Sequence, residues 1–479
     1  MIDIADLQAT SRRAWGAEIR ATLQLAWPLV LTNLAQVAFG ATDVVMMGWL
    51  GPDALAAGAL ATNLNFAFLI FGIGLVSAVA PMIAIERGRN RHAVREVRRS
   101  VRQGLWSSIL IALPIWAALW HAEPIFIGLD QDPVLAHVAA GYIRTLMWSI
   151  PPFLGYIVLR SFFAALERPL APLWVAGVAV LFNAALVWCL MFGKLGLPAL
   201  GLRGAGIGTT LSSLFLFAGV ALMLSLDRGF RRYRLFGRFW RADWPHFVEL
   251  WRLGLPIAAT LVFEVTVFNA AVFLMGLISA AALAAHSIAI QVASLAFMTP
   301  LGLGVAASVR VGRAYGARQW ADVTRAGWTA YGLAMVYACF TALIMLVAGR
   351  VLVGVFLDVS DPANAGVVRL AIAFVAIAGV FQLADSGQAV ASGMLRGLRD
   401  TRVPMLIAAV GYWGLGLPFG TVLGFYFGLG GIGIWIGLAT GLGIVATLLT
   451  IRWMRRDRLV TARGDDAGEP RPFIAATPL

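Results

Sequence analysis

Twelve apolar runs, each long enough to cross a lipid bilayer, divide this chain of 479 residues. The hydrocarbon layer of a membrane is about 30 Å thick, and an α-helix of about 20 residues crosses it. Because lipid offers no hydrogen bonds, such a run must pair its own backbone groups, and it does so as a helix. We therefore predict an all-α membrane protein. The predicted spans are residues 22–48, 55–84, 103–122, 136–158, 170–192, 203–226, 250–278, 284–308, 325–348, 366–393, 403–426 and 430–452.

The composition agrees with a chain that is solvated mainly by lipid. Hydrophobic residues make up 60% of the sequence and charged residues 13%, which is about half the charged fraction of a typical soluble domain. The net charge of +13 comes almost entirely from arginine, since Lys194 is the only lysine. The arginines stand between the apolar runs and not along an amphipathic face. This placement argues against nucleic-acid binding and for control of membrane topology.

The arginines fall in alternate loops. They precede the first span, lie in the loops after spans two, four, six, eight and ten, and follow span twelve. The opposite loops carry mainly acidic residues such as Asp130, Asp132 and Asp358. The positive-inside rule then places both termini in the cytoplasm. The polar segment 1–21 lacks the apolar core of a signal peptide, so we expect a multi-pass protein of a bacterial inner (plasma) membrane.

The second half of the chain repeats the first. Residues 228 positions apart are identical at Pro28 and Pro256, Met47 and Met275, Gly74 and Gly302, and Gly88 and Gly316. Prolines and glycines align as well as apolar residues, so shared hydrophobicity does not explain the match. We predict two pseudo-symmetric six-helix lobes, 22–226 and 250–453, joined by a basic cytoplasmic linker, 227–249. The segment 1–21 and a disordered tail, 454–479, are both predicted to be cytoplasmic. Parallel repeats predict a substrate path between the lobes.

Three carboxylates lie well inside predicted spans: Asp43, Glu264 and Asp385. A charge at the bilayer centre costs about 3 kcal/mol, so such a residue usually has a function. Glu264 lies 12 residues after Arg252, and Asp385 lies 11 before Arg396. Both carboxylates are therefore roughly 17 Å from a cytoplasmic arginine, at matching depth. We expect Glu264 and Asp385 to face each other within the second lobe.

Two buried carboxylates tend to hold a cation, because burial and mutual repulsion both disfavour two free negative charges. A proton, Na⁺ or a cationic substrate can then compete for one charge, which couples a downhill cation to uphill export. Oxygen ligands suit Na⁺ as well as H⁺, so the coupling ion stays open, and no cofactor is predicted. The alternative is that each acid bonds to a local hydroxyl or amide and only orders the packing.

The first lobe carries a different polar set. Gln36 stands where the second lobe has Glu264, and Asp43 stands where it has an alanine. Together with Asn183 and Thr209, these residues form a candidate first-lobe site for substrate or protons. Hydrogen bonding between helices alone would also account for the amide and the hydroxyl.

Other motifs predict no catalysis. The glycine run at 428–433 resembles a dinucleotide fingerprint, but no strand precedes it and no acid follows it. Gly433, Gly437 and Gly441 instead predict close helix packing. No Ser-His-Asp, metal-ligand or phosphate-loop arrangement occurs elsewhere, so we predict no enzyme. We expect His286 to act as a polar cap, and the two cysteines to be small buried hydrophobes.

Two segments resemble a known family. The stretch 254–317 (beginning GLPIAATLVFEVTVFNAAVF) is similar to the seventh and eighth helices of NorM-type multidrug and toxic compound extrusion (MATE) transporters. The stretch 381–405 (FQLADSGQAVASGMLRGLRDTRVPM) is similar to their tenth helix and the loop after it. The resemblance extends over residues 25–456 and implies an antiporter that exports cationic amphipathic compounds in exchange for Na⁺ or H⁺ by alternating access.

The resemblance also implies roles for particular residues. Glu264 and Asp385 match the cation site of the family's second lobe, and Asp43, Asn183 and Thr209 match polar positions of its first lobe. Two positions depart from the family's pattern. Val187 replaces a side chain that is often polar, which weakens a first-lobe cation site, and Ser287 replaces a common glutamine, which alters a substrate contact.

Two other functions compete with drug export as an interpretation of the sequence. A lipid-linked oligosaccharide flippase shares the two-lobe architecture, but it needs a cavity lined by arginine or lysine to hold a pyrophosphate, whereas we expect the arginines here to stay at loop level. A receptor or assembly protein needs a folded soluble domain, and the longest connection here is a short linker. We expect a monomer in the bilayer whose partners are small cationic drugs or dyes, with no nucleic acid.

Overall fold

The computed structural model describes residues 4–90, 92–237 and 243–457. Within these residues the chain is helical and contains no strand, and 12 helical segments are long and apolar enough to cross a membrane. The predicted fold class is therefore confirmed. The first-lobe elements are α1 (Ile4–Leu50), α2 (Pro52–Ser77), α3 (Val79–Arg89), α4 (Val94–Trp120), α5 (Ala122–Gly128), α6 (Pro133–Leu146), η1 (Met147–Ser149), α7 (Ile150–Ala165), α8 (Leu170–Phe192) and α9 (Gly201–Leu226). After α10 (Arg228–Arg231) follow α11 (Trp244–Ile278), α12 (Ala280–Gly316), α13 (Trp320–Val347), α14 (Gly349–Gly354), η2 (Pro362–Asn364), α15 (Ala365–Gly397), α16 (Arg402–Ala409), η3 (Val410–Gly416), α17 (Leu417–Thr421), η4 (Val422–Tyr426) and α18 (Gly430–Met454).

Several helices extend beyond the apolar run that predicted them. The helix α11 begins at Trp244, six residues before the predicted span, so it takes in the end of the predicted linker. The helix α12 continues to Gly316, eight residues past its apolar run. Hydropathy marks the part of a helix that lipid surrounds, and it misses a polar turn that continues beyond the lipid. The tail 458–479 and linker residues 238–242 lie outside the described residues.

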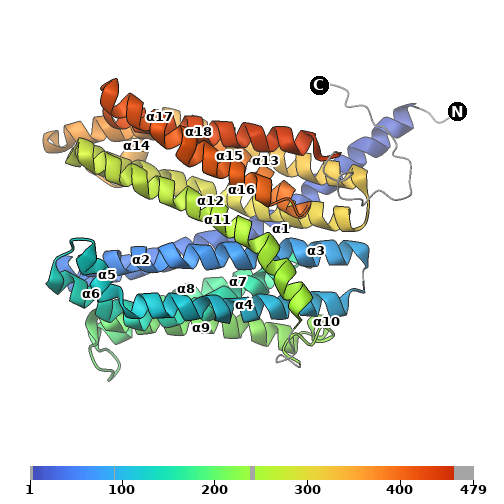
Figure 1. Cartoon of the computed structure of the whole chain (residues 1–479), viewed down its shortest axis with the longest axis horizontal. Coiled ribbons are helices and arrows are strands. Elements are labelled where there is room, and N and C mark those ends of the chain that lie inside the picture. Colours follow the sequence, from blue (N-terminus) through green and yellow to red (C-terminus); the bar gives the residue numbers. More distant parts are fainter. Residues whose placement is uncertain (1–3, 91, 238–242, 458–479) are drawn as a thin grey trace.

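The elements form two layers, one built from α2 to α9 and the other from α11 to α18 (Figure 1). The layers meet at the end that holds α3 and α10 and diverge toward the end that holds α5 and α6. The helices that join the layers are α1, α2 and α3 from the first lobe and α11 and α12 from the second.

Contacts between the lobes follow the repeat. In each contact a glycine of one lobe lies so close to a residue of the other lobe, through its backbone or, at Val30, its side chain, that no Cβ atom would fit. The contacts are Gly74 with Ala258, Gly302 with Val30, Gly88 with Arg313, and Gly316 with Ile85. Gly302 stands 228 positions after Gly74, and Val30 stands 228 positions before Ala258, so the first two contacts are equivalent under the repeat. The third and fourth contacts are related in the same way. Reciprocal contacts of this kind are those of two units around a twofold axis.

Prolines at equivalent positions shape the helices that join the lobes. Pro28 lies inside α1 and Pro256 inside α11, where each removes one backbone hydrogen bond. The hydroxyl of Thr32 donates to the carbonyl of Pro28 over 2.7 Å, and that of Thr260 donates to Pro256 over 2.9 Å. Threonine hydroxyls that bond back one turn favour a bend, so both lobes bend their first helix in the same way.

The predicted glycine packing of the last helix is present. Gly433, Gly437 and Gly441 of α18 each approach the backbone of the preceding span, which runs from α16 to η4 and includes two π-helical segments. Cys189 is buried as predicted, but Cys339 is exposed, so the prediction of a buried hydrophobe is wrong for Cys339. Its position on a membrane-spanning helix explains the difference, because an apolar residue there can face lipid.

Candidate functional site

The two carboxylates of the second lobe lie together. Glu264 extends from the middle of α11, and Asp385 extends from α15 and is 5% exposed. The two groups are close enough for their charges to interact. One oxygen of Asp385, Oδ1, is buried without a hydrogen-bond partner among the described residues. A buried carboxylate oxygen without a partner is unusual in a protein interior.

Gln388 links this pair to the next helix of the lobe. Its Nε2 atom donates to Oε2 of Glu264 over 3.4 Å and to the hydroxyl of Tyr412 over 2.8 Å. Asp385, Gln388 and Ser392 follow one another at spacings of three and four residues, which places them on one face of α15. The polar face of α15 and Glu264 of α11 therefore converge inside one lobe.

Glu264 opens onto a small internal cavity of about 20 Å³, enough for about one water molecule. The cavity is enclosed by α11, α15, α16 and the turn between α15 and α16. Its lining residues are Ile257, Thr260, Leu261, Glu264, Gln388, Ser392, Arg396, Asp400, Thr401 and Pro404. All of them belong to the second lobe.

Charged groups of both signs meet at this cavity. Arg396 of α15 lines the same cavity as Glu264 of α11, and the two charges interact. Asp400, at the other end, is paired with Arg452 of α18, with Nε 2.6 Å from Oδ2. The expectation that arginines stay at loop level is therefore wrong for Arg396. It is wrong for Arg160 as well, which lies within α7, five residues before the helix ends.

The first lobe has its own buried acid. Asp43 of α1 is 7% exposed, and its Oδ2 accepts a hydrogen bond of 2.8 Å from the hydroxyl of Thr209 on α9. Its Oδ1 has no partner among the described residues. Asn183 of α8 lies beside this carboxylate and is completely buried, yet neither polar atom of its side chain has a hydrogen-bond partner within the described ranges. Asp43, Asn183 and Thr209, which were predicted to form one site, therefore lie together in the structure.

Gln36 belongs to a second polar group, two helical turns away from Asp43. Gln36 lies against Tyr156 of α7. Arg160, which is also on α7, donates from Nη1 to Oδ1 of Asn33 over 3.0 Å. Asn33 donates in turn to the carbonyl of Met298 on α12 over 3.4 Å. This group reaches across to the second lobe. The structure thus divides the predicted first-lobe site into two parts.

His286 occupies a different environment from the one predicted. The cap of α12 is Ser279, whose Oγ accepts from the backbone nitrogen of Ala282 over 3.0 Å. His286 is completely buried, with its ring centroid 5.5 Å from that of Trp435. Neither ring nitrogen has a hydrogen-bond partner among the described residues. The prediction of a polar cap is wrong, because the helix begins six residues before His286.

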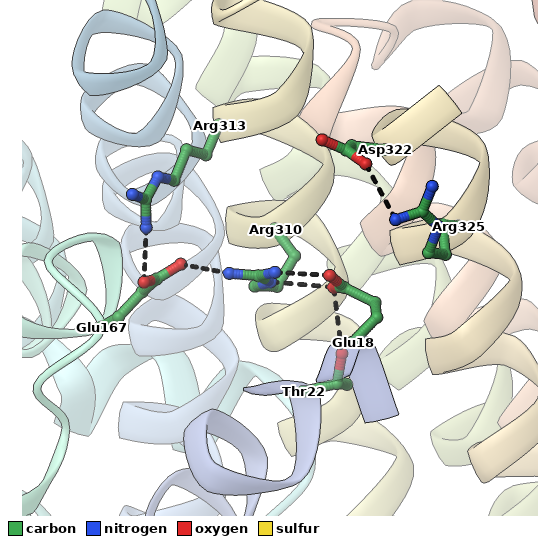
Figure 2. Close-up of polar contacts among 7 residues, drawn as sticks. All are labelled: Glu18, Thr22, Glu167, Arg310, Arg313, Asp322 and Arg325. Carbon is green, nitrogen blue, oxygen red and sulfur yellow. Dashed lines mark hydrogen bonds and ion pairs between the residues drawn. The ribbon is translucent and has the colours of Figure 1, made fainter. Parts of the chain in front are cut away.

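A network of ion pairs joins the lobes at the arginine-rich end (Figure 2). Arg310 of α12 donates to Glu18 of α1 over 2.9 and 2.5 Å and to Glu167, just after α7, over 2.7 Å. Arg313 pairs with the second oxygen of Glu167 at 2.5 Å. Burial raises the pKa of Glu167, but Arg310 and Arg313 together lower it by a larger amount. The pKa therefore lies below the ordinary value of 4.5.

The sequence pointed to the acids but missed several of their neighbours. Gln388, Ser392 and Arg396 share a helix face with Asp385, and this spacing was available in the sequence. Tyr412 and Glu18 carried no comparable signal, because each reaches its partner only through tertiary packing.

The match to a known protein family falls in two parts, one in each half of the internal repeat. The MatE family model matches residues 28–189 and 256–422, and the starts of its two matches are Pro28 and Pro256. The chain is 58% identical to a probable multidrug resistance protein NorM of Mesorhizobium japonicum, over 93% of this chain and 95% of that protein. It is 54% identical to a protein of the same description from Brucella suis, over 94% and 95%.

Solved structures share the fold. The eukaryotic MATE transporter AtDTX14 superimposes with a TM-score of 0.82 at 22% identity, covering 94% of this chain and 99% of that one. An outward-facing multidrug resistance MATE family transporter of the MOP superfamily gives 0.82 at 19% identity, covering 93% and 97%. These relatives are transporters, in agreement with the prediction that the chain is not an enzyme. The two matched halves and the relatives over nearly its full length show that this chain belongs to the MatE family of membrane transporters.

Proposed function

We propose that the protein is a secondary active multidrug exporter, which moves cationic amphipathic compounds out of the cell in exchange for Na⁺ or H⁺. The relatives described as multidrug resistance proteins support the export of drugs. The observation that carries the exchange is the pair of a partly buried Glu264 and a buried Asp385, whose Oδ1 has no hydrogen-bond partner in the part of the chain that the structure describes. Two acids at one buried site favour a bound cation, because each charge disfavours the other.

The exchange would follow alternating access. The lobes touch through glycines and ion pairs at the arginine-rich end, whereas the opposite ends diverge in Figure 1. With the arginine-rich end in the cytoplasm, this arrangement corresponds to an outward-open state in which a cation from outside can reach the carboxylates. Rocking of one lobe against the other would then open the cytoplasmic end.

The residues take distinct roles in this proposal. Glu264 and Asp385 bind the coupling cation, and the amide of Gln388 orients Glu264 through its hydrogen bond. Asp43, held by Thr209, handles substrate or protons in the first lobe, with Asn183 beside it. Gln36 belongs to the polar group at Tyr156 and Arg160, whose member Asn33 contacts the second lobe. We propose no cofactor, and we propose a monomer with both termini in the cytoplasm of a bacterial inner membrane.

The flippase alternative receives less support. Its pyrophosphate needs basic groups that are free to bind it. The charge of Arg396 instead interacts with that of Glu264, and Arg160 donates to Asn33. Acidic groups outnumber basic ones in the cavity that Glu264 lines.

Ethidium transport in proteoliposomes tests the proposal. A sodium gradient and a pH gradient are imposed separately, and fluorescence reports the dye. Transport driven by one of the gradients supports antiport and identifies the ion. Correctly folded protein that transports under neither gradient would contradict the proposal and favour an anionic lipid-linked substrate.

A further inference from the structure

The cavity beneath Glu264 contains a positive charge that the exchange mechanism has not used. Arg396 lines the same cavity of about 20 Å³ as Glu264 and Gln388. It stands eight residues after Gln388 and four after Ser392, on the polar face of α15 that also holds Asp385. Arg396 and Glu264 therefore line one space that has room for about one water molecule, whereas Asp385 lies 11 residues earlier on the same face of α15.

Arg396 is available to interact with Glu264. No hydrogen bond or ion pair within 4 Å holds its guanidinium among the described residues, and the charge with which it interacts is that of Glu264. The nearby carboxylate of Asp400 is occupied by Arg452. Arginine keeps its proton under all physiological conditions, so its positive charge is a permanent feature of the cavity.

The net charge of the site explains why such a group is useful. Two ionised carboxylates buried in a membrane would carry −2 once the coupling cation has left, and this state would bind the next cation too tightly to release it. With the guanidinium the empty site carries −1, and one monovalent cation brings it to zero. An empty site of low net charge is what the return step of an exchanger requires, because buried charge is costly to move through the protein interior.

We propose that Arg396 is a tethered counter-cation of the coupling site, which neutralises one carboxylate whenever the coupling cation is absent. The inference rests on the proposed cation exchange and adds its stoichiometry, one monovalent cation in each cycle. It also predicts a competition. The arginine weakens cation binding and thereby speeds cation release.

Arg396→Gln and Arg396→Met test the proposal in proteoliposomes that transport ethidium. The measured quantities are the maximal rate and the external concentration of the driving cation that gives half of it. We expect this half-saturating concentration to fall about tenfold or more in both neutral variants, since an opposite charge a few ångströms away typically changes proton affinity by that factor. The maximal rate should fall as well, because release becomes slow. Arg396→Lys, which keeps the charge, should leave the half-saturating concentration within about threefold of the parent.

Arg402→Gln is the matched control, because Arg402 is exposed just past the cavity and its loss removes the same charge from the same end of the protein. A purely structural role for Arg396, such as stabilising the last turn of α15, predicts a lower rate with an unchanged half-saturating concentration. That result would overturn the proposal. An equal shift in the lysine and the neutral variants would also overturn it. Should neither neutral variant fold, a tenfold shift in Arg396→Lys alone would contradict the charge account, and an unchanged value would support it.

The same experiment separates this inference from the proposed function. If neither cation gradient drives transport by the parent protein, the exchange itself is wrong, and the role of Arg396 is wrong with it. If the parent is driven by a gradient and the neutral variants keep its half-saturating concentration, the counter-cation alone is wrong.

Discussion

The guanidinium of Arg310 donates two hydrogen bonds to the carboxylate of Glu18, although 292 positions separate the two residues. Arg310 lies on α12 of the second lobe and Glu18 on α1 of the first. Both side chains are largely buried, with 20% and 10% of their surface exposed. The pair therefore fastens the lobes at the end where they already touch, and it must break if that end opens.

Loss of this pair should favour opening of the arginine-rich end. Arg310→Met removes the bonds to Glu18 and to Glu167, so Glu18 loses its arginine and Glu167 keeps only Arg313. We expect the equilibrium between closed and open forms to shift roughly five- to hundredfold, the usual range for such couplings. Distances between spin labels on α3 and α12 would report the shift.

Arg325→Met is the matched control for this measurement. Arg325 pairs with Asp322 over 3.2 Å within one helix of the second lobe (Figure 2), so its loss breaks no contact between lobes. Equal distance distributions in Arg310→Met and the parent would contradict the role of the network.

The ion pairs of Glu167 with Arg310 and Arg313 should be insensitive to pH near neutrality. Because the pKa of Glu167 is lowered in the folded protein, its stabilising effect is complete above its ordinary value of 4.5 and disappears as the pH falls through the lower, folded value. We expect the distance between α3 and α12 to stay constant between about pH 5 and 8 when Asp43→Asn, Glu264→Gln and Asp385→Asn remove the acids of the two candidate sites. A change within that range would show that this network itself senses protons.

The glycine contacts predict a symmetric effect of substitution. Gly88→Ala and Gly316→Ala each place a methyl group against the backbone of the opposite lobe, and the repeat makes the two contacts equivalent. Both variants should open the arginine-rich end to a similar extent. Gly48→Ala, where the added methyl group has nothing within 4 Å, should leave the spin-label distances unchanged. A large effect of only one of the two substitutions would contradict the equivalence.

Replacement of His286 by an apolar residue should stabilise the folded protein. Both ring nitrogens are buried without a partner, and each unpaired polar group costs about 1–3 kcal/mol. His286→Phe should therefore raise the thermal unfolding temperature of the purified protein. His286→Gln, which keeps polar atoms at this position, should give no such gain. A lower unfolding temperature for the phenylalanine variant would show that the ring is bonded to a water molecule or an ion.

The sequence predicted the scaffold well because its signals are local. Twelve apolar runs each need a helix, and the offset of 228 positions that joins Pro28 to Pro256 also relates the contacts between the lobes. The depth of Glu264 and Asp385 followed from counting residues to the nearest arginine, and the structure brings these two acids together.

The residues around the acids were harder to predict because they depend on tertiary packing. Hydropathy marks where lipid surrounds a helix, so Arg396, next to the end of α15, was assigned to a loop. Gln36 and Asp43 lie on one helix, but α7 and α9 draw them into different groups. The partners Glu18 and Arg310 meet only after both lobes have folded.

The most direct test of the central claim is the rate of ethidium transport driven by an imposed cation gradient, compared between the parent protein and Asp385→Asn. The substitution keeps the size of the side chain and removes one of the two charges that are proposed to hold the coupling cation. Asp358→Asn, in an exposed loop at the opposite end, is the control. We predict that the driven rate falls about tenfold or more, a loss of about 1.4 kcal/mol, in Asp385→Asn and in Glu264→Gln, and that it is unchanged in the control. Driven transport at the parent's rate in both site variants would contradict the assignment of these carboxylates as the coupling site.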